Sequence, residues 1–187
     1  MNLPNKLTFF RVLLIPIMVI VAYIDYLNVH EFVFDISLAE FIMCAIFTIA
    51  SLTDFLDGYL ARKNNQVTTF GKFADPLADK ILVMAALLIL MSRGLVYAWV
   101  CILILAREFL VTGVRLLAIE HGKVIAASKL GKYKTASTMV AIILLFFHAV
   151  DYLHTAGDIM MYVALALTVI SGIDYLYKNR GIIFESV

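Results

Sequence analysis

Residues 51–81 read SLTDFLDGYLARKNNQVTTFGKFADPLADKI, and they join two long apolar segments, 37–60 and 76–92. Each segment approaches the length of about 20 apolar residues that a helix needs to cross a bilayer core. Aspartates interrupt the apolar pattern where the two segments meet. Because a charged side chain is costly near hydrocarbon, such residues are expected to have a function. The stretch therefore predicts a membrane protein with a polar site at the junction of two spans.

The rest of the chain has the same character. Of its 187 residues, 63% are hydrophobic and 16% are charged, against roughly 45–50% and about 25% in soluble domains. Four more apolar stretches, at 8–28, 95–118, 135–153 and 157–177, raise the number of predicted spans to six. No repeat or linker divides the chain. We expect an all-α integral membrane bundle of six transmembrane helices that forms one domain over 1–187.

Charge predicts the orientation of this bundle. Six spans place 62–75, 119–134 and 178–187 on the same side as the N-terminus, and these segments are rich in Lys and Arg. The opposite loops have Arg93 as their only basic residue. The positive-inside rule therefore predicts a multi-pass cell-membrane protein with both termini and the aspartate junction in the cytoplasm. The first stretch lacks a cleavage site and is expected to remain as a span. The net charge of +1 gives no argument for a nucleic-acid partner.

The four aspartates at the junction are spaced for a metal site. Asp54 and Asp57 are spaced i, i+3 and Asp75 and Asp79 are spaced i, i+4, so each pair projects from one face of a helix. Four close carboxylates would hold protons unless cations lay between them. Oxygen ligands without His or Cys favour hard ions such as Mg²⁺ or Mn²⁺ over zinc. A single aspartate at a helix end is as often a solvated or capping group, but four at these spacings predict two divalent cations.

Neighbouring residues suggest what these cations do. Gly58 and Gly71 would let a ligand approach the backbone closely, and Arg62 lies two turns beyond Asp54, where it could hold a phosphate. Cations, carboxylates and arginine together favour phosphoryl transfer. A divalent-cation transporter is the alternative, although its acidic residues would be expected at several depths along a path.

The segment resembles the signature of the CDP-alcohol phosphatidyltransferase family, D-x-x-D-G-x-x-A-R-x8-G-x-x-x-D-x-x-x-D, and every position matches. The resemblance implies that the aspartates bind two metal ions and that Asp79 also takes the proton of the acceptor hydroxyl, although a role as ligand alone stays open. It also implies a homodimer embedded in membrane lipid. A further set would lie against the CDP-lipid donor: Asn5, Thr8, Gly58, Ala61, Arg62, Thr68 and Gly71. On physical grounds alone, Asn5 and Thr8 would be helix-start residues.

Three segments outside the signature concern the acceptor: PNKLTFFRVLLIP at 4–16, AREFLVTGVRLLA at 106–118 and AASKLGKYKT at 126–135. They are similar to the branch of the family that joins CDP-diacylglycerol to sn-glycerol 3-phosphate, which gives phosphatidylglycerophosphate and CMP. Inositol phosphate, serine and phosphatidylglycerol remain alternative acceptors.

Arg107 gives independent support for an anionic acceptor, because it lies in the middle of an apolar span. Glu108 points about 100° away on a helix, so we expect the partner of Arg107 to be a phosphate. Further basic residues would extend this site: Arg115, Lys129, Lys132 and Lys134. The alternative for the loop lysines is that they only follow the topology rule or contact anionic lipid heads. Cys44 and Cys101 are expected to be buried small side chains without a disulfide.

Overall fold

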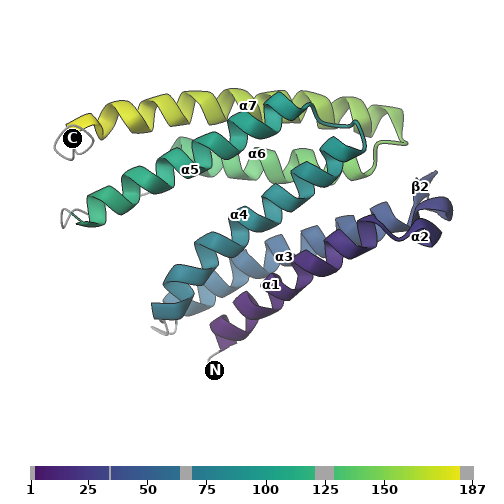
Figure 1. The fold of residues 1–187 in the computed structure, drawn as a ribbon, viewed down its shortest axis with the longest axis horizontal. Helices are drawn as coiled ribbons and strands as arrows, with labels where there is room; N and C mark the ends of the chain where they lie inside the picture. Colours follow the sequence, from purple (N-terminus) through teal and green to yellow (C-terminus); the bar gives the residue numbers. More distant parts are fainter. Residues whose placement is uncertain (1–2, 34, 64–68, 121–128, 182–187) are drawn as a thin grey trace.

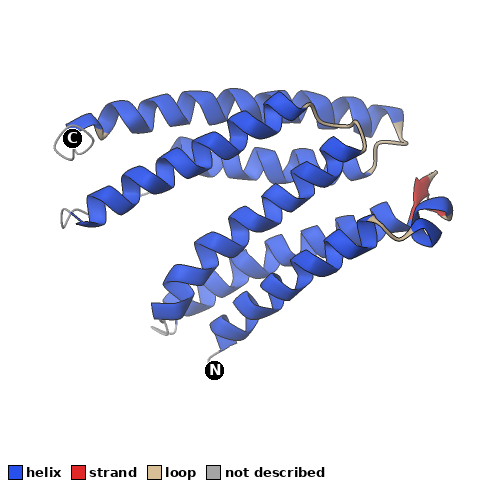
Figure 2. Ribbon diagram, viewed as in Figure 1, coloured by secondary structure: helices blue, strands red, loops and turns tan. Residues whose placement is uncertain are grey.

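The computed structural model describes residues 3–33, 35–63, 69–120 and 129–181, with side chains described over 8–32, 35–53, 77–120 and 130–181. Within these ranges there are seven helices (Figure 1): α1 Leu3–Ala22, α2 Asp25–Val29, α3 Leu38–Lys63, α4 Thr69–Ser92, α5 Ala98–Glu120, α6 Lys129–Phe146 and α7 Asp151–Lys178. Two short antiparallel strands, β1 Glu31–Val33 and β2 Ile36–Ser37, are the only β-structure of the described chain (Figure 2). The predicted all-α fold is confirmed.

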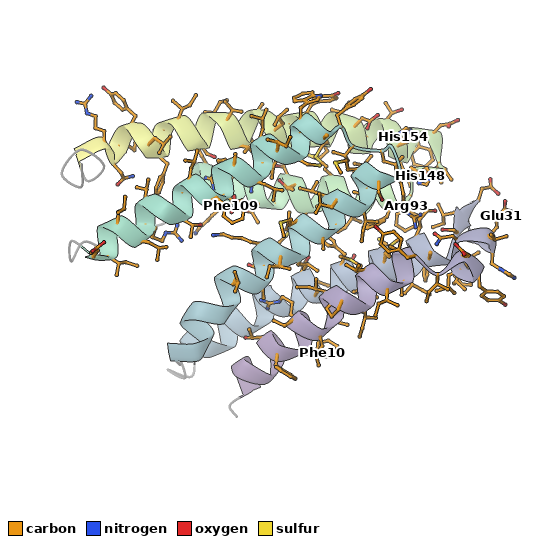
Figure 3. The ribbon with its side chains drawn as sticks, in the orientation of Figure 1. Phe10, Glu31, Arg93, Phe109, His148 and His154 are labelled. Carbon is orange, nitrogen blue, oxygen red and sulfur yellow. The ribbon has the colours of Figure 1, made fainter. Side chains whose placement is uncertain are left out.

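The long helices run back and forth between two ends of the bundle. α1, α3 and α4 form one group and α5, α6 and α7 form another, and the two groups separate toward the end where both termini lie (Figure 1). They meet at the opposite end, where Glu31, Arg93, His148 and His154 gather (Figure 3). The fully buried core includes Phe47, Leu82, Leu87, Ile104 and Phe146. The bundle is therefore closed by apolar packing at one end and divided at the other.

One described helix meets both requirements for crossing a membrane, sufficient length and apolar composition. Among the described residues, α7 alone is long and apolar enough to span a bilayer, while Thr8–Ala22 and Leu38–Thr53 are shorter apolar helices. α5 and α6 have the length but carry several charged residues: Arg107, Glu108, Arg115 and Glu120 in α5, and Lys129, Lys132 and Lys134 in α6. The prediction of six spans therefore stays a prediction.

The first predicted span is too long at its C-terminal end. α1 ends at Ala22, and not near residue 28, because the Asn28 side-chain amide donates to the carbonyl oxygens of Ala22 at 3.1 Å and Ile24 at 3.0 Å. Carbonyls at a helix C-terminus lack intrahelical donors, so this amide stabilises the end of the helix. The apolar residues that follow belong to the short helix α2 and not to a continued span.

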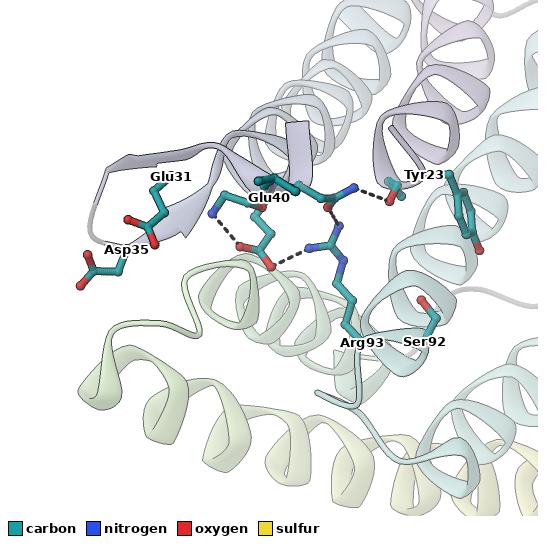
Figure 4. A pocket seen from close by; sticks show the side chains of 10 residues that line it. Tyr23, Glu31, Asp35, Glu40, Ser92 and Arg93 are labelled. Atoms are coloured by element: carbon teal, nitrogen blue, oxygen red, sulfur yellow. Dashed lines mark hydrogen bonds and ion pairs between the residues drawn. The ribbon is translucent and has the colours of Figure 1, made fainter. Parts of the chain in front are cut away.

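A capping box starts α3. The Glu40 backbone N–H donates to Ser37 Oγ at 3.2 Å, and Glu40 Oε2 accepts from the Ser37 backbone N–H at 3.0 Å. The other carboxylate oxygen of Glu40 accepts from Arg93 Nη1 at 2.6 Å, and Arg93 Nη2 donates to Asn28 Oδ1 at 2.6 Å (Figure 4). His148 Nδ1 lies 3.6 Å from Glu40 Oε1. Glu40 and Arg93 thus connect α3 and the end of α4 to the segment after α1.

Arg93→Met should destabilise this end of the bundle. The Glu40 side chain is only 7% exposed, and removing one partner of a buried ion pair leaves an uncompensated charge, so we expect a loss of about 3 kcal/mol. Thermal unfolding in detergent measures it. Lys178→Met is the control, because its i,i+4 pair with Asp174 is exposed and should contribute less than about 0.5 kcal/mol. Equal unfolding temperatures for the two variants would contradict the role given to Arg93.

Candidate active site

Consecutive antiparallel helices carry the four predicted metal ligands. α3 contains Asp54 and Asp57, and α4 contains Asp75 and Asp79. Asp57 lies six residues before the end of α3 and Asp75 six residues after the start of α4, which is about 9 Å of helix in each case. Asp54 and Asp79 each lie about one turn deeper. The backbone therefore places the two pairs at matching depths.

Most side chains of this predicted site lie outside the described residues. That holds for Asp54, Asp57 and Asp75, and for Asn5, Gly58, Ala61, Arg62, Gly71 and Lys129, whose helices are described; Thr68 lies outside entirely. The described side chains include no group of three or more His, Cys, Asp or Glu that could hold a metal ion. The predicted metal site therefore stays a prediction.

Asp79 is the described member of the acidic set, and it is in contact with α1. Its side chain is 33% exposed, and Arg11 Nη1 lies 3.5 Å from its Oδ1. The Arg11 side chain is fully buried, and Thr8, one turn earlier in α1, is also buried. A buried cation therefore lies beside the Asp79 carboxylate. Sequence reasoning did not assign Arg11 to the site, although a charged residue within the first apolar stretch was a signal for it.

A basic cavity of about 560 Å³ opens beside the aspartate junction, between the two groups of helices. Four cationic side chains from α4, α5 and α6 line it: Lys80, Arg107, Arg115 and Lys132. Glu108 is the one acidic side chain among its described lining residues. The structure therefore brings together three of the five residues predicted to bind the acceptor phosphate, Arg107, Arg115 and Lys132.

Arg107 has protein partners, in contrast to the expectation from sequence. Its Nη1 donates to Glu108 Oε1 at 3.0 Å, and its Nη2 donates to Ser171 Oγ at 3.1 Å. The prediction that Glu108 would not pair with Arg107 is wrong, because the long arginine side chain spans the angle between adjacent helix positions and both residues line the same cavity. Lys134 Nζ also donates to Glu108 Oε1, at 2.6 Å. The positive charge of Lys134 is therefore already paired with the Glu108 carboxylate.

Several buried polar atoms at this cavity lack a protein partner. Among the described residues they include Ser51 Oγ, Arg107 Nε, Arg115 Nε and Tyr175 Oη, and all four of these residues line the cavity. Buried donors without partners are unfavourable unless water or a ligand satisfies them. Two guanidinium groups and two hydroxyls suit a ligand that carries an anion and hydroxyl groups.

A second cavity, of about 230 Å³, connects this basic region to Asp79. Lys80, Glu108 and Arg115 line both cavities, and Lys80 Nζ donates to Thr112 Oγ1. The remainder of the second cavity is largely apolar, with Leu77, Ile104 and Phe109 among its walls. The arrangement places a carboxylate, a cationic region and an apolar wall beside one another.

Sequence reasoning missed Lys80, Ser51 and Tyr175 as lining residues. Lys80 directly follows Asp79, and Ser51 precedes Asp54 by one helical turn, so helical spacing could have suggested both. Tyr175 comes from the last helix, and no local pattern connects it to the junction.

These features define a class of protein: a helical, strongly apolar protein in which an acidic helix junction adjoins a basic cavity, as phosphoryl-group transferases require. The profile of the CDP-alcohol phosphatidyltransferase family matches residues 1–170. The chain belongs to this family.

Curated relatives agree over nearly the whole chain. A Bacillus subtilis protein is 45% identical over 183 residues, covering 95% of each chain. A Rickettsia felis protein is 39% identical over 178 residues, with 93% of each chain covered, and a Haemophilus influenzae protein is 38% identical over 191 residues, with 100% of this chain and 97% of its own covered. All three are named CDP-diacylglycerol–glycerol-3-phosphate 3-phosphatidyltransferase. The predicted resemblance is confirmed.

Proposed function

We propose that this protein transfers the phosphatidyl group of CDP-diacylglycerol to sn-glycerol 3-phosphate and releases phosphatidylglycerophosphate and CMP. The relatives named above carry this activity in their names. The observation that carries the proposal is the basic cavity beside Asp79, because a phosphorylated acceptor needs cations and its attacking hydroxyl needs a base. Arg107, Arg115 and Lys132 would bind the acceptor phosphate, with Lys129 as a further member.

The proposed metal site fits the residues that are present. Its donors are four carboxylates, which suit a pair of Mg²⁺ or Mn²⁺ ions, and the matching depths of the pairs on α3 and α4 are consistent with shared ions. Bound divalent ions would neutralise the pyrophosphate charge that grows as CMP leaves. Asp79 would accept the proton of the acceptor hydroxyl, and Arg11, whose Nη1 lies 3.5 Å from Asp79 Oδ1, would orient the carboxylate.

The proposal includes a membrane setting. Six spans, both termini in the cytoplasm and a cytoplasm-facing site would let a donor with two acyl chains reach the junction from the bilayer while the soluble acceptor enters from water. Both termini lie at the same end of the bundle, as an even number of crossings requires (Figure 1). A homodimer is also proposed, from the resemblance to the family.

Acceptor competition tests the proposed function. Purified protein in detergent with Mg²⁺ or Mn²⁺, CDP-diacylglycerol and labelled sn-glycerol 3-phosphate should release CMP and form labelled lipid. Unlabelled inositol phosphate, serine or phosphatidylglycerol should leave that label unchanged when added in equal amount. Preferential use of any of these acceptors would refute the choice of glycerol 3-phosphate while preserving the chemistry.

The apolar core argues against the alternative of a divalent-cation transporter. An acidic cavity of about 530 Å³ at the opposite end is lined by Glu31, Asp35 and Glu40 among others, so polar groups are present at both ends of the bundle. Fully buried Phe47 on α3 and Leu87 on α4 lie between the two regions along their helices. Dehydrated apolar packing of this kind blocks ion passage. Metal flux into proteoliposomes without CDP-lipid would contradict this conclusion.

Arg107→Ala should weaken acceptor binding. Hydrogen bonds from a charged donor contribute about 1.5–3 kcal/mol, so the KM for sn-glycerol 3-phosphate should rise about 10- to 100-fold. The KM for CDP-diacylglycerol should change little. Steady-state assays that vary each substrate in turn measure both constants. Lys178→Ala, an exposed cation on α7, is the control for loss of one positive charge. An unchanged acceptor KM in Arg107→Ala would exclude a phosphate-binding role.

A further inference from the structure

Two adjacent residues of α7 hold the side chain of Arg107. Ser171 is fully buried, and its Oγ donates to the Thr168 carbonyl oxygen at 3.2 Å. That hydroxyl proton is thereby engaged, so the Ser171 lone pairs are available to accept from Arg107 Nη2 at 3.1 Å. Glu108 accepts from the other terminal nitrogen of Arg107 at 3.0 Å. Because the guanidinium is planar, these two contacts fix its orientation.

Gly172 makes room for the stem of the same arginine. A Cβ atom at position 172 would lie 3.0 Å from Arg107 Cγ, closer than such contacts normally come. Arg107 and Gly172 also line an apolar groove of about 180 Å³ between α5 and α7, together with Leu110 and Ile173. The aliphatic part of Arg107 therefore packs against the α7 backbone, while its charged group reaches the basic cavity.

We propose that Ser171 and Gly172 are positioning residues for acceptor binding, and that they act through Arg107. This inference rests on the proposed function, because it assigns the Arg107 guanidinium to the acceptor phosphate. Arg107 Nε is buried without a protein partner, so the held guanidinium keeps a donor for a ligand. An arginine that is already ordered loses less conformational entropy when the phosphate binds. Any side chain at 172 would move the stem and tilt the guanidinium away from this orientation.

Kinetics of Ser171→Ala and Gly172→Ala test the proposal. We expect the KM for sn-glycerol 3-phosphate to rise about threefold to tenfold in each, less than in Arg107→Ala because the guanidinium is misaligned and not removed. The kcat and the KM for CDP-diacylglycerol should stay within about twofold, because neither substitution removes a proposed contact to the CDP-lipid or to the reacting groups. Ser171→Thr keeps the hydroxyl and should recover part of the loss.

Two glycines of the chain provide matched controls. A Cβ at Gly113 on α5 would meet nothing within 4 Å, so Gly113→Ala should be neutral. A Cβ at Gly157 on α7 would lie 2.9 Å from Leu145 Cδ2, so Gly157→Ala should lower the unfolding temperature without changing the acceptor KM. Comparison of the unfolding temperature with the acceptor KM thereby distinguishes a packing defect in α7 from a displacement of Arg107.

A double-mutant cycle decides whether the effect passes through Arg107. In an Arg107→Ala background, Ser171→Ala and Gly172→Ala should no longer change the acceptor KM. Equal effects in both backgrounds, or an unchanged KM in the single variants, would overturn the proposal. Inorganic phosphate supplies a readout that does not need turnover: its stabilising thermal shift should weaken in Gly172→Ala and not in Gly157→Ala. Failure of the unmodified protein to use glycerol 3-phosphate would refute the proposed function, whereas an equal phosphate shift in all variants would refute the positioning role itself.

Discussion

Asp79→Asn should reduce turnover at least about 1,000-fold, since loss of a general base alone is typically worth 10²–10⁴-fold and a metal ligand would be lost with it. Asn has nearly the volume of Asp but neither its charge nor its basicity. The substitution also removes the anionic partner of buried Arg11, so some loss of stability should accompany the loss of chemistry. CMP release at saturating substrates measures the effect, and the unfolding temperature shows whether the variant remains folded.

A metal titration of Asp79→Asn separates its two proposed roles. If Asp79 is only a ligand, a higher Mg²⁺ or Mn²⁺ concentration should recover most of the turnover, because mass action compensates for weaker binding. If it is also the base, the recovered rate should remain far below that of the unmodified enzyme. Asp174→Asn removes a carboxylate on α7 that pairs with Lys178 and should leave activity unchanged. Full turnover in Asp79→Asn would show that the assigned chemistry is wrong.

Chelation of divalent metal should abolish CMP release. Four carboxylates on α3 and α4 would repel one another without cations, and bound divalent ions would neutralise the negative charge that develops on CMP as it leaves. We expect EDTA to reduce the rate to background and added Mg²⁺ or Mn²⁺ to restore it.

The control for chelation is the binding of inorganic phosphate. Among the described residues, the lining of the basic cavity has four cationic side chains and does not include Asp79, so the phosphate-induced thermal shift should persist in EDTA. Undiminished turnover after removal of metal, verified by elemental analysis, would refute the metal-dependent mechanism.

Helix positions were largely predictable where apolar composition is continuous. The stretches predicted at 37–60 and 95–118 correspond closely to α3 and α5, because apolar residues continue along nearly the whole length of both helices. The ends were less predictable. The Asn28 side-chain amide stabilises the end of α1. The strand pair that follows lies in a polar segment whose composition does not distinguish a strand from a loop. The Ser37–Glu40 capping box was readable from its spacing but was not recognised.

The candidate site was predictable where its residues are close in sequence. The aspartates on α3 and α4, and Arg107 with Arg115 on α5, lie on helices whose spacing can be counted. Contacts between distant helices could not be counted in that way. Ser171 and Gly172 meet Arg107 from 64 and 65 positions further along the chain, and only the packing of α7 on α5 brings them there. The buried environment of Cys44 and Cys101, both free thiols, was predicted correctly from composition.

At the closed end of the bundle, Glu40 Oε1 accepts from Arg93 and lies 3.6 Å from His148 Nδ1, so the two helix groups are in contact there. Asp79 lies fourteen residues before Arg93 on α4, which is about 21 Å at 1.5 Å per residue. A rotation of the α1–α3–α4 group by about 5° around that contact would displace Asp79 by about 2 Å, from the same helix geometry. A small rotation at the closed end would therefore change the spacing between the two helix groups at the level of Asp79.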